Sequence, residues 1–113
     1  MEDMTTKRPH FAGVYRAYDP VSGETLVGYS YNVLATFNRY KLELAMRACT
    51  IQALQRLWNS TGGNMKLEIL ERHPGDPENE DPADMEESLQ AMAEKHVQLL
   101  GEKARLLQMD TRG

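Results

Sequence analysis

Hydrophobic and polar side chains alternate in two short stretches near the start of the chain, which is typical of β-strands. The first stretch reads AGVYRAYD and the second reads TLVGYS, and both contain aromatic and β-branched residues. The segment that joins them, DPVSGET, is rich in turn formers. The pattern predicts a β-hairpin whose connection is longer than two residues.

Helical periodicity follows the hairpin. After Asn32, a good N-cap residue, apolar side chains recur at steps of three and four, which predicts an amphipathic helix whose end the sequence does not define. Thr50 offers a second N-cap, and the segment NSTGG stops the helix that begins there. The apolar positions are Val33, Phe37, Tyr40 and Leu44 in the first helix and Ile51, Leu54, Leu57 and Trp58 in the second.

A third strand and a polar segment come next. The stretch NMKLEILER puts Met65, Leu67 and Ile69 on one side, which predicts a strand with one buried face. Residues 73–84, HPGDPENEDPAD, are rich in proline and acidic side chains and predict a solvated linker.

The last predicted element is an amphipathic helix from a cap at about Asp84 to about Gln108. Its apolar face consists of Met85, Leu89, Met92, Val97, Leu100 and Leu107. The order β-β-α-α-β-α indicates an α+β fold, with a small three-stranded antiparallel sheet covered by helices.

The length of 113 residues suits one compact domain. We expect a flexible N-terminal tail at residues 1–10, a core at 11–72, the acidic proline-rich linker at 73–84, and a C-terminal helix at 85–108 that completes the same domain.

Charge is distributed unevenly along the chain, whose formal net charge is −4. Residues 1–72 carry nine Lys and Arg against seven Asp and Glu, a balance of +2. Residues 73–113 carry four against ten, a balance of −6. Because phosphate contacts need Lys and Arg, a nucleic-acid surface is expected in the first two-thirds, on the hairpin and first helix.

The single cysteine, Cys49, can build neither a disulfide framework nor a structural zinc site, which favours the reducing cytoplasm. The N-terminal segment MEDMTTKRPH lacks the apolar core of a secretory signal, and the apolar runs are too short to span a bilayer. We therefore expect a cytoplasmic protein with no membrane partner.

Two tripeptides carry a family resemblance: Gly13-Val14-Tyr15, and Leu26-Val27-Gly28 at the usual distance behind it. With the segments YSYNVLATFNRYKLEL and LQRLWNSTGGNMKLEILE, they make the chain similar to the GIY-YIG nuclease superfamily over residues 11–72. The resemblance implies the scaffold of a divalent-metal-dependent DNA endonuclease, with Mg²⁺ or Mn²⁺ as its cofactor if the chain is active.

The resemblance implies catalytic roles for only part of the site. Tyr15 matches the first motif tyrosine, and Tyr40 matches a position where the family has His or Tyr as an accessory group. Leu26 and Thr36 stand where the second tyrosine and the catalytic arginine are expected, and losing one charge-stabilising group typically costs about a hundred- to a thousand-fold in rate. Arg39 lies one helical turn after Thr36 and is the candidate substitute.

No neighbouring tyrosine replaces Leu26 by default. Tyr29 has the opposite strand parity, so it is expected on the other face of the sheet. Tyr18 and Tyr31 have the same difficulty.

The family's metal ligand is a glutamate on the last helix, and Glu94 is the candidate for that position. Glu86, Glu87 and Glu102 are alternatives in the same region, so the choice among them stays open.

Three functions remain open at this level, and whether the protein is an enzyme is one of the open points. The first is an endonuclease scaffold with impaired or lost cleavage. The second is a non-catalytic module on the same fold that binds nucleic acid or a protein. The third is a helper protein whose acidic terminal helix docks on a partner.

Overall fold

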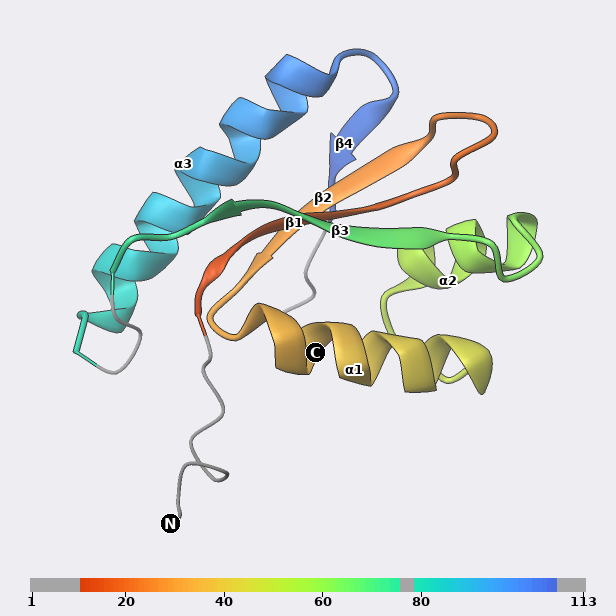
Figure 1. Cartoon of the computed structure of the whole chain (residues 1–113), viewed down its shortest axis with the longest axis horizontal. Helices are drawn as coiled ribbons and strands as arrows, with labels where there is room; N and C mark the ends of the chain where they lie inside the picture. Colours follow the sequence, from red (N-terminus) through yellow and green to blue (C-terminus); the bar gives the residue numbers. More distant parts are fainter. Residues whose placement is uncertain (1–10, 76–78, 108–113) are drawn as a thin grey trace, which may run out of the picture.

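The structure is a computed structural model that describes residues 11–75 and 79–107 (Figure 1). The predicted N-terminal tail and the predicted helix end at Gln108 lie outside these residues. The elements in chain order are β1 (Gly13–Tyr18), β2 (Thr25–Ser30), α1 (Val33–Ala45), α2 (Gln52–Ser60), β3 (Lys66–Arg72), α3 (Pro82–Leu100) and β4 (Ala104–Leu106).

The predicted hairpin is present. β1 and β2 pair antiparallel, with Tyr15 opposite Gly28, and the connection from Asp19 to Glu24 is longer than two residues. A backbone hydrogen bond from Gly23 to Asp19 closes the turn. The predicted hairpin, which carries the tyrosine motif, is therefore confirmed.

The sheet corrects the predicted fold in one respect: it has four strands in the order β3-β1-β2-β4 and is mixed rather than antiparallel. β3 pairs antiparallel with β1, but β4 pairs parallel with β2. The helix predicted to reach Gln108 ends at Leu100, because Gly101 adopts a φ of +99° and turns the chain back to the sheet. The α+β class is correct.

Helices cover both faces of the sheet (Figure 1). α1 and α2 lie on one face, where the main core forms around Tyr15, Leu26, Tyr40 and Leu54. α3 crosses the other face. The second core there contains Val14, Val27, Ala93 and Ala104, and a third, smaller cluster contains Ala12, Met85 and Leu89.

The helix starts agree with the sequence in one case of three. Asn32 caps α1, and its side chain accepts a hydrogen bond from the Ala35 N–H. α2 begins after Ile51 rather than Thr50, without a side-chain cap. α3 begins after Asp81 rather than Asp84, because Asp81 precedes the proline that starts the helix.

β3 has a bulge that alters its predicted face. The register with β1 shifts so that Tyr15 pairs with Ile69 while Val14 pairs with Glu71, and Leu70 lies between them. Leu70 therefore packs against the α3 side, and Ile69 is 40% exposed instead of buried.

The start of the predicted linker is packed rather than solvated. His73 is buried, its Nδ1 accepts from the Gly75 N–H, and its Nε2 lies 3.1 Å from the Ser88 hydroxyl on α3. The domain boundaries otherwise stay a prediction. Within the described residues, no helix is long and apolar enough to cross a membrane.

Candidate functional site

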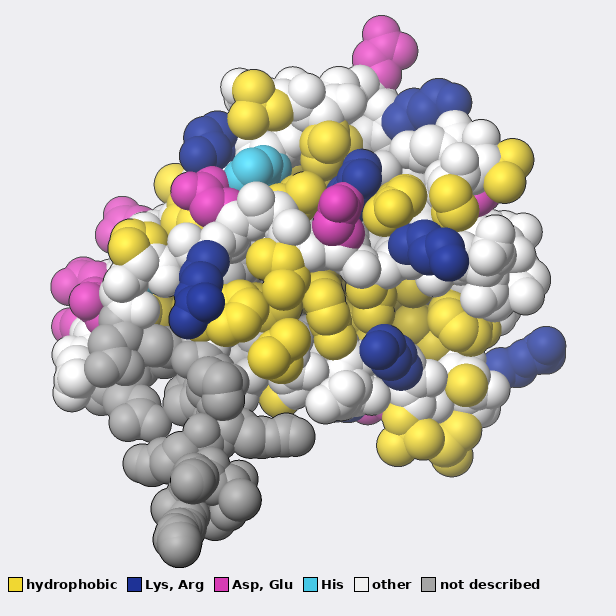
Figure 2. Space-filling model, viewed as in Figure 1, with side chains coloured by type: hydrophobic (Ala, Val, Ile, Leu, Met, Phe, Trp, Pro, Cys, Tyr) yellow, Lys and Arg dark blue, Asp and Glu magenta, His cyan; other side chains and the backbone are white. Residues whose placement is uncertain are grey.

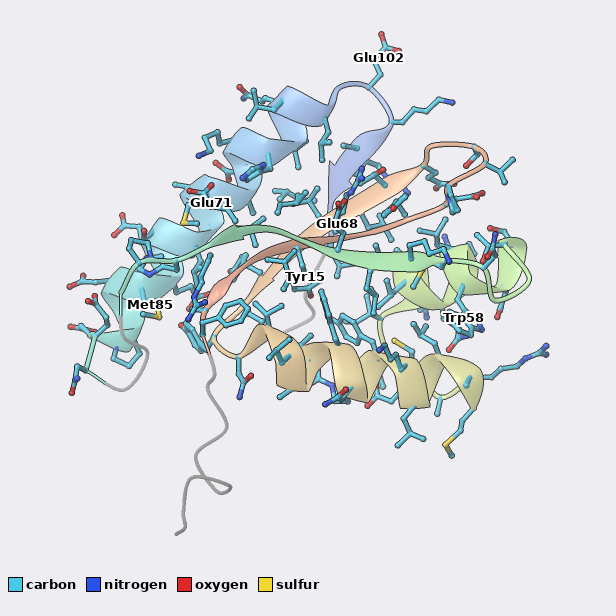
Figure 3. All side chains as sticks on the ribbon, in the orientation of Figure 1. Tyr15, Trp58, Glu68, Glu71, Met85 and Glu102 are labelled. Atoms are coloured by element: carbon cyan, nitrogen blue, oxygen red, sulfur yellow. The ribbon has the colours of Figure 1, made fainter. Side chains whose placement is uncertain are left out.

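The motif tyrosine lies inside the protein. Tyr15 points from β1 toward α1, and its hydroxyl oxygen is 2.7 Å from that of Tyr40 (Figure 3). Both side chains are fully buried, and their rings meet edge to face, as do those of Tyr15 and Phe37. The structure thus brings together two of the sequence candidates, Tyr15 and Tyr40, as a buried hydroxyl pair.

Both motif glycines are required by close contacts. A Cβ at Gly28 would stand 2.8 Å from the Tyr15 hydroxyl oxygen, so the tyrosine ring lies directly over the neighbouring strand. A Cβ at Gly13 would stand 2.5 Å from the carbonyl oxygen of Glu71 on β3. Real Cβ atoms do not come this close to other atoms, and the two glycines are therefore needed for packing.

The C-terminal strand closes the site. Leu107 follows β4, its backbone N–H donates to the Val27 carbonyl at 2.7 Å, and its side chain is buried in the same cluster as Tyr15. Its Cδ2 would also lie 3.2 Å from a Cβ at Gly28, beside the tyrosine hydroxyl. The Tyr15 hydroxyl is therefore enclosed by protein.

Burial sets the chemistry of the hydroxyl pair. The pKa of Tyr15 is raised well above 10.0, chiefly by desolvation and further by Tyr40. The pKa of Tyr40 is also raised by desolvation. Tyr15 is thus a neutral phenol at physiological pH, and a buried neutral phenol is neither a base nor a nucleophile for a phosphodiester in water.

Leu26 and Thr36, at the positions where the resemblance leads us to expect a tyrosine and an arginine, have structural roles. Leu26 is buried in the main core beside Tyr15. Thr36 is buried in α1, and its hydroxyl lies 2.7 Å from that of Ser30, which in turn accepts from the Asn32 N–H. Leu26 thus fills the core, and Thr36 anchors the start of α1.

Arg39 lies on the surface of α1, outside the hydroxyl pair. Its side chain is 55% exposed, with Nε 3.7 Å from Glu43. Its guanidinium carbon is 5.4 Å from the centre of the Tyr40 ring. The Arg39 charge acts to lower the pKa of both Tyr15 and Tyr40, but desolvation by burial is the larger effect and raises both pKa values. Arg39 reaches solvent and the hydroxyl pair does not.

The other tyrosines do not take the place of Leu26. Tyr29 packs against α3 on the opposite face, as its strand parity predicts, and donates to Glu86 at 3.3 Å. Tyr31 donates to the Pro82 carbonyl, and the ring of Tyr18 lies under Arg16.

Glu94 is separated from Tyr15 by the sheet. It is exposed on α3, next to Ala93, whose side chain packs on the sheet face away from α1. Glu71, the nearest strand carboxylate to α3, is bound by Lys95 at 2.9 Å and His96 at 2.8 Å (Figure 3). Hydrogen bonds from these two residues lower the pKa of Glu71.

Glu94, the candidate ligand, does not lie beside Tyr15. Mg²⁺ is usually held by one or two carboxylates together with waters and substrate phosphate. Within residues 11–75 and 79–107, no group of three or more His, Cys, Asp or Glu side chains could hold a metal ion. Glu94 is on the wrong face for Tyr15 to share an ion with it.

The structure also has a groove that the sequence did not predict. It encloses about 330 Å³ between α1, the end of α2 and the start of β3. Figure 2 shows a band of hydrophobic side chains between β3 and α1, with Lys and Arg side chains on both of its borders. The groove is lined by Phe37, Lys41, Leu44, Trp58, Gly63, Met65, Lys66 and Leu67. The sequence signal for it is Trp58, which the periodicity places on the apolar face of the second helix.

The fold is similar to solved structures of one catalytic domain. A point mutant of the catalytic domain of intron endonuclease I-TevI matches with a TM-score of 0.60 and 19% sequence identity, over 80% of this chain and 84% of that chain. The catalytic domain of homing endonuclease I-TevI matches with a TM-score of 0.55 and 21% identity, over 80% of this chain and 94% of that chain. No protein-family model and no curated protein matches the sequence. The chain therefore has a GIY-YIG-like fold, shared with an endonuclease catalytic domain.

Proposed function

We propose that this protein is a GIY-YIG-like domain that no longer cleaves phosphodiesters and instead binds nucleic acid without a metal ion. The observation that carries the loss of cleavage is the enclosure of the Tyr15 hydroxyl by Tyr40 and Leu107. A substrate phosphate needs contact with the reacting groups, and a buried neutral phenol offers none.

The remaining machinery supports the same proposal. Leu26 lacks the phenol and Thr36 lacks the guanidinium that the chemistry would need. Leu26 is packed in the main core, and Thr36 is hydrogen-bonded to Ser30 at the start of α1. Glu94 lies on the opposite face of the sheet from Tyr15. Cleavage would need these groups on one surface, and a divalent cation has no shared site with Tyr15.

The distribution of ion pairs supports a polyanionic partner. Four described Lys and Arg side chains have carboxylate partners, while four others have no side-chain ion pair, hydrogen bond or ring contact within the described residues. The paired cations are Arg16, Arg39, Lys95 and Arg105, and the unpaired ones are Lys41, Arg47, Arg56 and Lys66.

The unpaired cations lie on α1, the turn after it, α2 and β3. They belong to the basic two-thirds of the chain and can neutralise phosphates without losing an internal partner. The structural neighbours are catalytic domains of an endonuclease, which makes nucleic acid the partner class that we propose.

Two assays on the purified protein test this. Supercoiled plasmid is incubated with Mg²⁺ or Mn²⁺, and labelled oligonucleotides are titrated in EDTA with fluorescence anisotropy as the readout. We expect no nicking with either metal, and binding in EDTA that weakens as salt is raised. Tyr15→Phe should leave binding unchanged, because the hydroxyl is enclosed. Metal-dependent nicking that Tyr15→Phe abolishes would overturn the proposal.

A further inference from the structure

We infer that the groove between α1, α2 and β3 binds single-stranded nucleic acid, with a base against Trp58 and the neighbouring phosphates on Lys41 and Lys66. This inference rests on the proposed function and assigns it a surface. Tyr15 and Tyr40 are not among the residues that line the groove, although Phe37, which does line it, contacts the Tyr15 ring.

The floor of the groove is apolar and aromatic. Phe37 and Trp58 are half-buried, so each ring has one part in the core and one part toward the groove. Nucleobases stack on such rings whatever their sequence, because every base has a π-face. Figure 3 shows Trp58 on α2, in the space between β3 and α1.

The loop after α2 runs beside the indole. Gly63 has a φ of +86°, a conformation that favours glycine, and a Cβ there would stand 3.5 Å from Trp58 Cζ2. The loop backbone therefore lies next to the ring and glycine adds no side chain over it. Trp58 and Gly63 line the groove together.

The charges of the groove are of one sign. Lys41 comes from α1 and Lys66 from β3, so the two ammonium groups belong to different walls. Among the residues that the structure describes, no carboxylate lines the groove. Neither lysine has an ion pair within the part of the chain that the structure describes, so an anion would not have to displace an internal partner.

The size of the groove favours a single strand over a duplex. Its volume of about 330 Å³ lies at the low end of small-ligand sites, typically about 300–1,000 Å³. That is room for about one nucleotide, not for stacked base pairs. In a duplex the ring faces are hidden in the stack, whereas an unpaired base can enter and lie on an aromatic side chain. An acidic peptide would meet the lysines but would leave the indole without a planar partner.

Trp58 is the only tryptophan, so its fluorescence reports directly on the groove. A mixed-sequence single-stranded 12-mer is titrated into the full chain in EDTA, with the same sequence as a duplex and an acidic peptide as comparisons. We expect the single strand to quench Trp58 and to bind more tightly than the duplex.

Substitutions then locate the site. Trp58→Ala should weaken single-strand binding roughly 5- to 140-fold, the usual loss for one stacked base, and Trp58→Phe should retain most of it while keeping the fold. Lys41→Ala and Lys66→Ala should each lower the slope of log affinity against log salt by about 0.7. Lys95→Ala is the control for position, because it removes the same charge from α3 on the opposite face. Lys95 is ion-paired with Glu71, so we expect this variant to leave the salt slope unchanged.

The outcomes separate this inference from the proposed function. In one outcome, the protein binds oligonucleotides without quenching of Trp58 fluorescence, and Lys41→Ala binds as tightly as Lys95→Ala. That result would overturn the assignment of the binding site to the groove and leave the proposal of nucleic-acid binding intact. No binding of any oligonucleotide would overturn both. Quenching by the acidic peptide but not by the single strand would overturn the inference in favour of a protein ligand.

Discussion

The Tyr15–Tyr40 pair allows a sharp test of whether the motif tyrosine now serves stability. The two hydroxyl oxygens are 2.7 Å apart and both side chains are fully buried. Within the described residues, neither hydroxyl has another hydrogen bond. Each therefore depends on the other for its only partner.

The magnitudes follow from this mutual dependence. Tyr15→Phe leaves the Tyr40 hydroxyl buried without a partner, and Tyr40→Phe does the converse, so each should lower the free energy of unfolding by about 1–3 kcal/mol. The double variant removes both hydroxyls at once and leaves an apolar contact of nearly the same shape. Its loss should be close to zero and smaller than that of either single variant.

The measurement is urea unfolding of the four proteins, followed by Trp58 fluorescence at one protein concentration, with equal m-values as the check on two-state behaviour. Tyr18→Phe is the control; the Tyr18 ring lies under Arg16 at the edge of the hairpin, and we expect a change within about 0.5 kcal/mol. A double variant that loses the sum of the two single losses would refute the shared hydrogen bond.

Three further predictions concern stability. Gly28→Ala should cost about 1–3 kcal/mol, because its methyl group would stand 2.8 Å from the Tyr15 hydroxyl oxygen; an unchanged urea midpoint would contradict this packing. Arg47→Gly should gain about 1 kcal/mol in the same assay, since Arg47 has a φ of 58°, whereas Arg47→Ala, with its Cβ, should not. The pKa of Tyr15 is raised in the folded state, so the free energy of unfolding should fall as pH rises above about 10, the pKa of tyrosine in the unfolded chain. The variant with phenylalanine at both positions should show a shallower fall. Equal slopes for the two proteins would argue against the buried phenol.

Local sequence patterns were sufficient to predict the hairpin that carries the tyrosine motif and the start of α1. The period of two predicted the hairpin, and it also predicted that Tyr29 would face away from the position of Leu26. Asn32 identified the start of α1, because its side chain satisfies a backbone N–H that the helix leaves free. Each of these depends on residues close together in the chain.

Long-range packing accounts for what the sequence did not predict. β4 has three residues, too few for an alternation to be recognised, and it forms only because Gly101 ends α3 and returns the chain to β2. The enclosure of Tyr15 depends on Leu107, which follows that strand. The groove forms where α1, α2 and β3 meet, so the sequence pattern of any one of these elements does not predict it.

Gly13 and Gly28 have a consequence for how such domains evolve. Their missing side chains make room for a backbone carbonyl and a phenol ring, so any descendant that folds this way must keep them, whether or not it still cuts. The steric need for these two positions is independent of any catalytic step, so finding both glycines in a sequence is evidence for this strand packing and not, by itself, for turnover.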